Sequence, residues 1–247
     1  MKILKNITVF TMVMLLSVST VLEAREKNIS NFSSSASNLV DSTGTFDGNK
    51  IYADVANNGL FLDYHVSGDS ALEWPKGTGV HSIFQSALWM GATVNGSIRT
   101  IVGDYTQDMG PGPWGGDPLA AVHRIYKVEK SMLASPLDFA DFQEWPVEFG
   151  APWVDVDGDG VYTPLPGGTD HPEFLGDQVL WFVSNDGDPA YKLNFGTSPM
   201  NVEIQTTMFG FDRPDVFGDM VFLKQLVINK GSDDLVDTYM GLGQTLT

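Results

Sequence analysis

Residues 82–105 read SIFQSALWMGATVNGSIRTIVGDY, and this stretch decides the fold class. On both sides of Asn95-Gly96, apolar side chains alternate with polar or small ones, which is the pattern of half-buried strands. Asn-Gly readily supplies the positive φ values that a tight two-residue turn requires. The stretch therefore predicts a β-hairpin.

Similar short β patterns recur from residue 50 to the end of the chain, separated by turns rich in Gly, Asn, Asp and Pro. No long helical period is present, and only residues 136–145 are expected to form one or two helical turns. Many short strands joined by such turns predict an all-β fold, an antiparallel β-sandwich-like domain with long loops and little helix. Further strands are expected at residues 51–55, 60–66, 122–128, 179–184, 202–211, 220–228 and 236–242.

Three parts are expected along the chain. Residues 1–24 combine a positive start, from Lys2 and Lys5, with an apolar stretch and a small residue at the end, and so predict a secretory signal peptide. The apolar stretch is short for a membrane span, which needs about 20 residues, so cleavage is favoured over anchoring. Residues 25–49 are rich in Ser, Asn, Thr and Gly and predict a flexible leader. Residues 50–247 are expected to form one β-rich domain.

The last two expected strands lie close to the end of the sequence. Residues 219–229 and 235–242 are expected to pair as a hairpin, and the sequence stops a few residues later. Nothing follows that would complete the domain, so truncation at the C-terminus is expected, with an exposed sheet edge.

Charge and composition exclude several classes of protein. With 14 basic and 31 acidic side chains, and a formal net charge of -17, the chain is not expected to bind nucleic acid through a basic face. The absence of cysteine rules out disulfides, zinc–thiolate sites and a cysteine nucleophile. The four histidines lack zinc-hydrolase spacing, and no Gly-x-Ser-x-Gly elbow occurs. No catalytic residue is predicted, and an enzyme is less expected than a binding or structural protein.

Residues 155–162, DVDGDGVY, carry the sharpest motif. Carboxylates at alternate positions, with glycines that permit a tight loop, converge their oxygens on one hard cation. The pattern matches the first half of a calcium loop, with side-chain oxygens from Asp155, Asp157 and Asp159 and a backbone carbonyl from Val161.

The second half of the calcium loop does not match. The twelfth position should be an acid and is Pro166, so a more distant acid would have to complete the site. The candidates are Asp170, Glu173 and Asp177. A structural Ca²⁺ site is expected, and the alternative is an acidic surface turn, because Asp and Gly favour turns in any case. A second acidic segment, residues 185–188, is more consistent with a hairpin turn.

The six tryptophans allow two interpretations. Exposed tryptophans on a rigid β face stack on sugar rings or apolar ligands. Alternatively, these side chains fill the core and cover the bases of loops. The first interpretation makes polysaccharide or another surface component a candidate partner.

Several short motifs occur in an order that is similar to a known family. They are NGLF at 58–61, EWPKG at 73–77, ALWMGA at 87–92, GAPW at 150–153 followed by DVDGDG at 155–160, GDQ at 176–178, and FLK at 222–224 with INK at 228–230. In these motifs the chain resembles the N-terminal region of large uncharacterised secreted or surface proteins of Bacteroidetes- and Ignavibacteria-like bacteria. Many of those proteins carry a C-terminal sorting domain for type IX secretion, which residues 1–247 do not include. The resemblance implies a secreted or cell-surface location and assigns no catalytic residue.

Together the patterns predict a secreted or cell-surface structural, adhesive or ligand-binding module with a calcium-stabilised Asp-rich loop. The alternative is an extracellular hydrolase acting on polysaccharide, because its pair of carboxyl groups would be set by folding rather than by local sequence. After cleavage of the signal peptide, no stable insertion into a membrane is expected.

Overall fold

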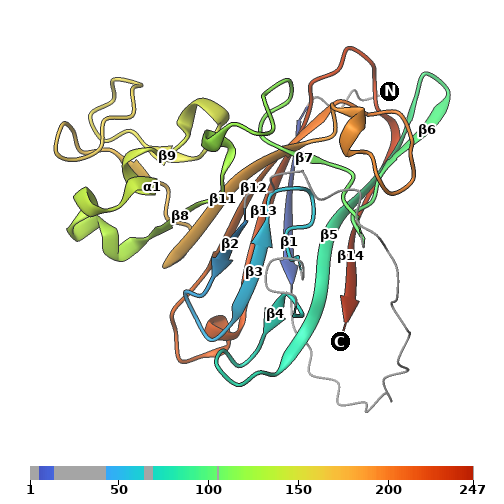
Figure 1. The fold of residues 1–247 in the computed structure, drawn as a ribbon. Coiled ribbons are helices and arrows are strands. Elements are labelled where there is room, and N and C mark those ends of the chain that lie inside the picture. Colours follow the sequence, from blue (N-terminus) through green and yellow to red (C-terminus); the bar gives the residue numbers. More distant parts are fainter. Residues whose placement is uncertain (1–5, 14–42, 64–68, 105, 247) are drawn as a thin grey trace.

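A computed structural model describes residues 6–13, 43–63, 69–104 and 106–246. Two antiparallel sheets pack against each other, as Figure 1 shows. This arrangement confirms the predicted all-β, sandwich-like fold with long loops and little helix. No helix in the described ranges is long and apolar enough to cross a membrane.

Sheet A has the strand order β1-β13-β12-β11, and two short strands both pair with β11. Its members are β1 (Asn6–Val13), β13 (Val221–Asn229), β12 (Val202–Gly210), β11 (Gln178–Asn185), β7 (Gly110–Pro111) and β8 (Tyr126–Glu129). Sheet B has the order β14-β5-β4-β3-β2, with one further strand on β5. Its members are β14 (Val236–Leu246), β5 (His81–Val94), β4 (Leu72–Glu73), β3 (Tyr52–Ala56), β2 (Thr43–Phe46) and β6 (Ser97–Ile101).

The remaining elements are short. A two-stranded ladder is formed by β9 (Trp153–Val154) and β10 (His171–Pro172). The helical turns are α1 (Ala140–Gln143), η1 (Ala121–His123), η2 (Lys130–Ala134), η3 (Pro136–Asp138), η4 (Val147–Phe149), η5 (Pro189–Tyr191) and η6 (Val216–Asp219). The turns η3 and α1 fall where one or two helical turns are expected.

The predicted hairpin is confirmed by β5 and β6. Val94 pairs with Ser97, and the two turn residues have positive φ, 50° at Asn95 and 77° at Gly96. Positive φ at both central residues is the requirement of the tight turn that Asn-Gly favours. The strand β5 is the longest, and its other edge pairs with β14.

The main core lies between the two sheets. Leu180 and Phe182 of β11 pack in one cluster with Val55 of β3 and Ile83 of β5. Alternate residues of a strand point to opposite faces, so the residues between these positions on β11 face outward from the sandwich.

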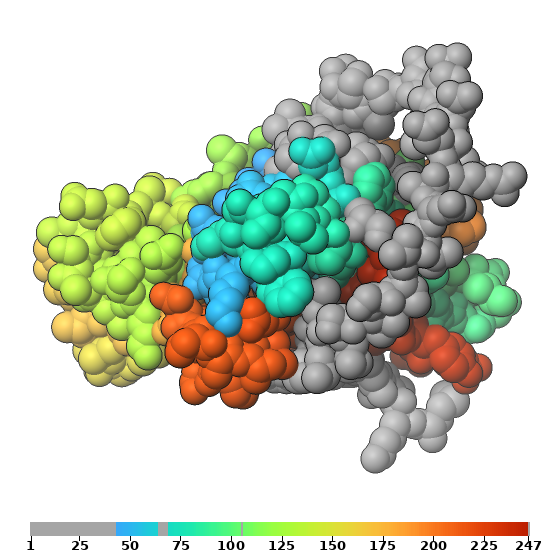
Figure 2. Space-filling model, turned by 90° about the horizontal axis from the view of Figure 1, so that it is seen from below, coloured from blue at the N-terminus to red at the C-terminus, as the bar shows by residue number. Residues whose placement is uncertain are grey.

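A layer of loops and short helices covers the outer face of β11. Val179 and Trp181 of β11 pack there against Phe142 and Trp145. Every residue of β11 is therefore buried. Figure 2 shows this layer, in yellow and green, as a lobe beside the strands of the sandwich.

The pairing predicted for the last strand is wrong. Although β13 and β14 follow each other in sequence, β14 pairs with β5 in sheet B, whereas β13 lies between β12 and β1 in sheet A. The connection crosses from one sheet to the other. Its Gly and Ser residues are as suitable for a crossing loop as for a hairpin turn, so the local sequence does not separate the two.

The domain begins before residue 50, the boundary expected from composition. Thr43–Phe46 forms β2 and pairs with β3, and the Phe46 side chain is fully buried. The part of the predicted leader from residue 25 to residue 42 lies outside the described residues. Of the predicted signal peptide, residues 6–13 form β1, and the other residues lie outside the described ranges. Cleavage at residue 24 stays a prediction.

Two other strand predictions are partly met. In the segment 60–66, Leu62 forms an isolated bridge with Ser86, and residues 64–66 lie outside the described ranges. In the segment 122–128, η1 precedes the strand, which begins only at Tyr126. Residues 185–188 are not a tight hairpin turn, because the connection from β11 to its partner β12 spans residues 186–201.

Candidate metal centre

The Asp-rich loop is carried by the short ladder of β9 and β10. Val154 pairs with His171, so the residues just beyond the ladder, Asp155 and Asp170, enter the loop side by side. The loop is also fixed at Tyr162, whose ring meets Trp153 edge to face at 5.5 Å. The Tyr162 hydroxyl donates a hydrogen bond of 2.6 Å to the carbonyl oxygen of Phe142.

Four carboxylates converge in this loop. Each of Asp155, Asp157, Asp159 and Asp170 offers an oxygen, and these four oxygens all lie within 4.8 Å of one another. The Asp170 side chain is buried, and the other three are exposed. We call these four residues the Asp cluster.

Backbone hydrogen bonds fold the loop around Asp155. Its two carboxylate oxygens accept from Gly158 N at 2.7 Å and from Gly160 N at 2.9 Å. Both glycines have positive φ, 79° and 78°, which side chains other than Gly rarely adopt. Glycine at these two positions therefore lets the chain turn tightly enough to gather the aspartates.

Asp170 is held from the opposite side of the loop. Its oxygens accept from Val156 N and Thr163 N, both at 2.8 Å. These backbone hydrogen bonds, from Thr163 and Val156, lower the pKa of the Asp170 carboxyl below its ordinary value. Asp170 is therefore fixed in place as a carboxylate at neutral pH.

The carboxylates also repel one another. A hydrogen bond from the backbone of Asp159 lowers the pKa of Asp157, but desolvation and the negative charges of Asp159, Asp170 and Asp155 outweigh it, so that the pKa is raised. A cation among the four carboxylates would reverse this repulsion. The Asp cluster could hold a metal ion, and an all-oxygen set suits a hard divalent cation.

The outcome for the predicted ligands is mixed. The structure brings together Asp155, Asp157, Asp159 and Asp170. Of the three acids considered for the remaining ligand, Asp170 is therefore the one that joins the loop. Glu173 and Asp177 do not belong to the Asp cluster, because β10 leads the chain away from the loop. The Asp177 carboxylate instead accepts a hydrogen bond from Asp212 N at 2.9 Å. For Val161, the backbone N–H donates to Asp159 at 2.7 Å.

A second feature, a surface pocket of about 340 Å³, was not indicated by any motif. Its floor and walls come from two segments that meet beside β11, and we call it the Trp114 pocket. It is lined by Gly110, Pro111, Trp114, Gly115, Gly116, Pro118, Asn185, Gly187, Asp188, Pro189 and Tyr191.

Trp114 is held rigidly at the Trp114 pocket. Its backbone N–H donates to the buried carboxylate of Glu203 at 3.0 Å, and its indole N–H lies 3.4 Å from Asn201 Oδ1. The indole also lies so close to Gly187 that a Cβ there would come within 2.6 Å of the ring. Even so, 43% of Trp114 is exposed.

The tryptophans divide between the two interpretations of the sequence. Trp145 and Trp181 are buried in the outer layer, as the core interpretation expects. Trp89 and Trp114 are 42% and 43% exposed. Of these two, Trp114 lines the pocket, and the Trp89 indole N–H donates to the carbonyl oxygen of Gly103 at 2.7 Å.

Comparisons of the chain with protein-family models, with curated proteins and with solved structures find no match. What the protein does must therefore be argued from its own residues.

Proposed function

We propose that the protein is a secreted or cell-surface β-sandwich module with a structural Ca²⁺ site at the Asp cluster. The observation that carries the proposal is the convergence of four carboxylates from the two ends of one loop. Ca²⁺ is favoured over Mg²⁺ because it takes about six to eight oxygen ligands in a flexible geometry, whereas Mg²⁺ keeps several of its waters. Ca²⁺ bound here would tie Asp155 to Asp170 and fix the loop to the outer layer.

The proposed location rests on the sequence. The predicted signal peptide and the resemblance to secreted bacterial proteins both support export. Extracellular modules commonly bind Ca²⁺ with Kd values of about 10⁻⁴ to 10⁻³ M, which suits a medium with abundant calcium. Fractionation of cells that produce the protein with its predicted signal peptide would test this location, and recovery of the chain from the cytoplasm would contradict it.

Thermal unfolding in EDTA and then in excess Ca²⁺ tests the site. Binding confined to the folded state adds about 2.7 kcal/mol when the free ion exceeds Kd a hundredfold. For a chain of this length each kcal/mol raises Tm by roughly 2–4 °C, so a rise of about 5–10 °C is expected. The double variant Asp157→Asn with Asp159→Asn should lose this rise.

A matched control removes the same number of charges elsewhere. Asp233 and Asp234 lie in the connection between β13 and β14, outside the Asp cluster. Asp233→Asn with Asp234→Asn should keep the full response to Ca²⁺. An equal loss in both double variants would mean that Ca²⁺ only screens the net negative charge of the chain.

The Trp114 pocket supports a second function, the binding of a neutral sugar ring. Trp114 offers an exposed aromatic face at a fixed position, on which the apolar face of a sugar packs. Asp188 brings a carboxylate to the same pocket, which can accept hydrogen bonds from the hydroxyl groups of a sugar. The net charge of -17 disfavours an anionic ligand.

A polysaccharide hydrolase has less support at this pocket. Glycoside hydrolysis uses two carboxyl groups on either side of the bond that breaks. Asp188 is the single acidic residue among those that line the pocket. A binding module accounts for the arrangement without a second acid.

Titration calorimetry with neutral gluco- and manno-oligosaccharides tests the sugar site. Trp114→Ala should abolish the binding, because it removes the stacking surface. Trp89→Ala is the matched control, since Trp89 is equally exposed but does not line the pocket. Binding that survives Trp114→Ala, or that is lost equally in Trp89→Ala, would contradict the assignment.

A further inference from the structure

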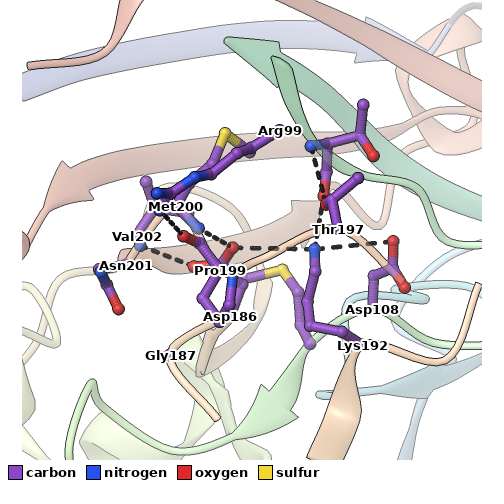
Figure 3. A network of polar contacts seen from close by, with 12 residues as sticks. Arg99, Asp108, Asp186, Gly187, Lys192, Thr197, Pro199, Met200, Asn201 and Val202 are labelled. Atoms are coloured by element: carbon purple, nitrogen blue, oxygen red, sulfur yellow. Dashed lines mark hydrogen bonds and ion pairs between the residues drawn. The ribbon is translucent and has the colours of Figure 1, made fainter. Parts of the chain in front are cut away.

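A buried lysine, next in sequence to Tyr191 of the Trp114 pocket, lies between two buried aspartates. Lys192 follows η5, Asp186 follows β11, and Asp108 lies in the connection between β6 and β7. The side chain of Lys192 is 2% exposed, and both aspartate side chains are fully buried. Figure 3 shows the Lys192 amine between the two carboxyl groups, 3.7 Å from Asp108 Oδ2 and 3.8 Å from Asp186 Oδ2.

This arrangement is a poor ion pair. Both separations exceed the range of about 2.7–3.2 Å in which N–H groups form hydrogen bonds to oxygen. The shortest polar contact of the amine is with a neutral acceptor, the carbonyl oxygen of Thr100. A buried ion pair offsets the loss of hydration only when its geometry is excellent, so burial acts against the charged forms of Lys192 and Asp186 here.

Burial acts in opposite directions on the lysine and on one of the acids. Desolvation lowers the pKa of Lys192 below its ordinary value, in spite of the nearby charges of Asp108 and Asp186. Desolvation also raises the pKa of Asp186, in spite of hydrogen bonds from Met200 N and Val202 N. The lowered pKa makes the nucleophilic, neutral form of the lysine easier to reach, and the raised pKa makes Asp186 a better proton acceptor and donor in a relay.

The Asp108 carboxyl is fixed and polarised by the backbone. Its Oδ1 accepts from Asn194 N at 2.8 Å, and its Oδ2 accepts from Val102 N at 3.0 Å. N–H groups aimed at a carboxyl oxygen stabilise the negative charge that develops there when a nucleophile attacks the carbon. Leu193 N also donates to the carbonyl oxygen of Gln107, which keeps the two segments in register.

We propose that Lys192 and Asp108 condense in the folded protein to an intramolecular amide, an isopeptide bond. A proton passes from the Lys192 ammonium to the Asp108 carboxylate, which gives a neutral amine and a carboxylic acid. The amine attacks Cγ of Asp108, a new C–N bond forms, and the C–O bond to the departing hydroxyl breaks. Asp186 carries one proton from the attacking nitrogen to that hydroxyl, which leaves as water. The nitrogen keeps its other proton, Asp186 returns to its initial state, and no oxidant or reductant is needed.

In a chain without cysteine, the bond would join the β6–β7 connection, which runs from sheet B to sheet A, to the β11–β12 connection of sheet A. Asp108 lies between a strand of sheet B and a strand of sheet A, and Lys192 is next to Tyr191 of the Trp114 pocket. A covalent link here closes the chain between them into a loop and fixes one wall of the pocket. The proposal is independent of the metal and sugar sites.

The mass of the denatured, purified protein is the first test. The folded wild-type chain should be lighter than its sequence by one water molecule, after allowance for any N-terminal processing. Trypsin should fail to cut after Lys192, and fragmentation should yield a branched peptide that joins Lys192 to Asp108. The full sequence mass in the wild-type protein would overturn the proposal, and this measurement needs no variant that folds.

Variants assign the roles. Lys192→Arg keeps a long basic side chain but removes the nucleophilic amine, and should show the full mass. Asp186→Asn keeps the shape of the acid but cannot shuttle the proton, so it should leave most of the chain unlinked. The matched control is Lys230→Arg, because Lys230 also pairs with a buried acid, at 3.2 Å from Glu203 Oε2, and this variant should still lose one water.

Two further outcomes would overturn the assignment. Water loss at an Asp-Gly sequence, such as Asp157-Gly158, would identify a succinimide instead, which hydroxylamine cleaves. A branched peptide joining Lys192 to Asp186 would show that the roles of the two acids are wrong.

Discussion

Replacing Phe46 with alanine tests where the folded domain begins. Phe46 lies in β2, within the segment that composition assigns to a flexible leader, but its side chain is fully buried in the core between the sheets. Its ring reaches across the sandwich to β12, where a Cβ on Gly210 would come within 2.5 Å of Phe46 Cζ. Phe46 therefore packs against both sheets.

The magnitude follows from this burial. Removing a fully buried Phe ring costs about 3–5 kcal/mol. For a domain of this size that corresponds to a fall in Tm of roughly 6–20 °C, at about 2–4 °C for each kcal/mol. Phe195→Ala is the control, because Phe195 is 64% exposed and its removal should change stability by less than about 0.5 kcal/mol.

A double-mutant cycle makes the test specific to the contact across the sandwich. Gly210→Ala alone should destabilise by about 1–3 kcal/mol, because the added methyl overlaps the Phe46 ring. With Phe46→Ala present, that overlap disappears, so the double variant should be less destabilised than the sum of the single ones. Urea unfolding measures all four proteins. Equal stability of Phe46→Ala and Phe195→Ala, or strict additivity, would refute the packing of β2 described above.

Three further predictions concern single contacts. Hydrogen bonds from the Trp74 indole and from Lys50 lower the pKa of Asp219 in the folded protein. The stability that this carboxylate adds is therefore present above its unfolded pKa of about 3.9 and is lost as the pH falls through the lower folded pKa. The difference in unfolding free energy between wild type and Asp219→Asn should shrink between about pH 6 and pH 2, and a constant difference would contradict this. In Gly158→Ala the added Cβ meets no neighbour, but the residue is forced to φ 79°. Ca²⁺ affinity, measured by calorimetry, should therefore fall about fivefold to thirtyfold, the equivalent of about 1–2 kcal/mol. Unchanged affinity would mean that Ca²⁺ binding does not depend on this loop conformation. Gly187→Ala should displace the Trp114 indole, so tryptophan emission should shift to longer wavelength, and an unchanged spectrum would count against the close contact.

Features decided by neighbouring residues could be predicted from the sequence. The β5–β6 turn depends on Asn95 and Gly96 alone, and the first three aspartates of the loop lie within five residues. The fourth member, Asp170, could be narrowed only to a choice among three acids. The choice is made by the pairing of Val154 with His171, a tertiary contact that leaves no local pattern.

Features decided by contacts distant in sequence could not be predicted. Asp108, Asp186 and Lys192 occur in three unrelated segments, and Asp186 lies in a stretch that has the composition of a turn. The partner of β14 was misassigned for the same reason. A hairpin and a crossing between sheets use the same turn residues, and only the packing of the whole sandwich distinguishes them.

The position of β1 has a consequence for the precursor and the mature chain. The eight residues of β1 pair with Val221 to Ile228 of β13 and so cover that edge of sheet A. These residues belong to the segment that is predicted to be cleaved. Its removal would leave a long row of backbone N–H and C=O groups without partners, which is a template for a strand from another molecule. If that cleavage takes place, the predicted signal peptide would cover this edge only in the uncleaved chain, and its removal would leave an edge that a strand of a second chain can extend.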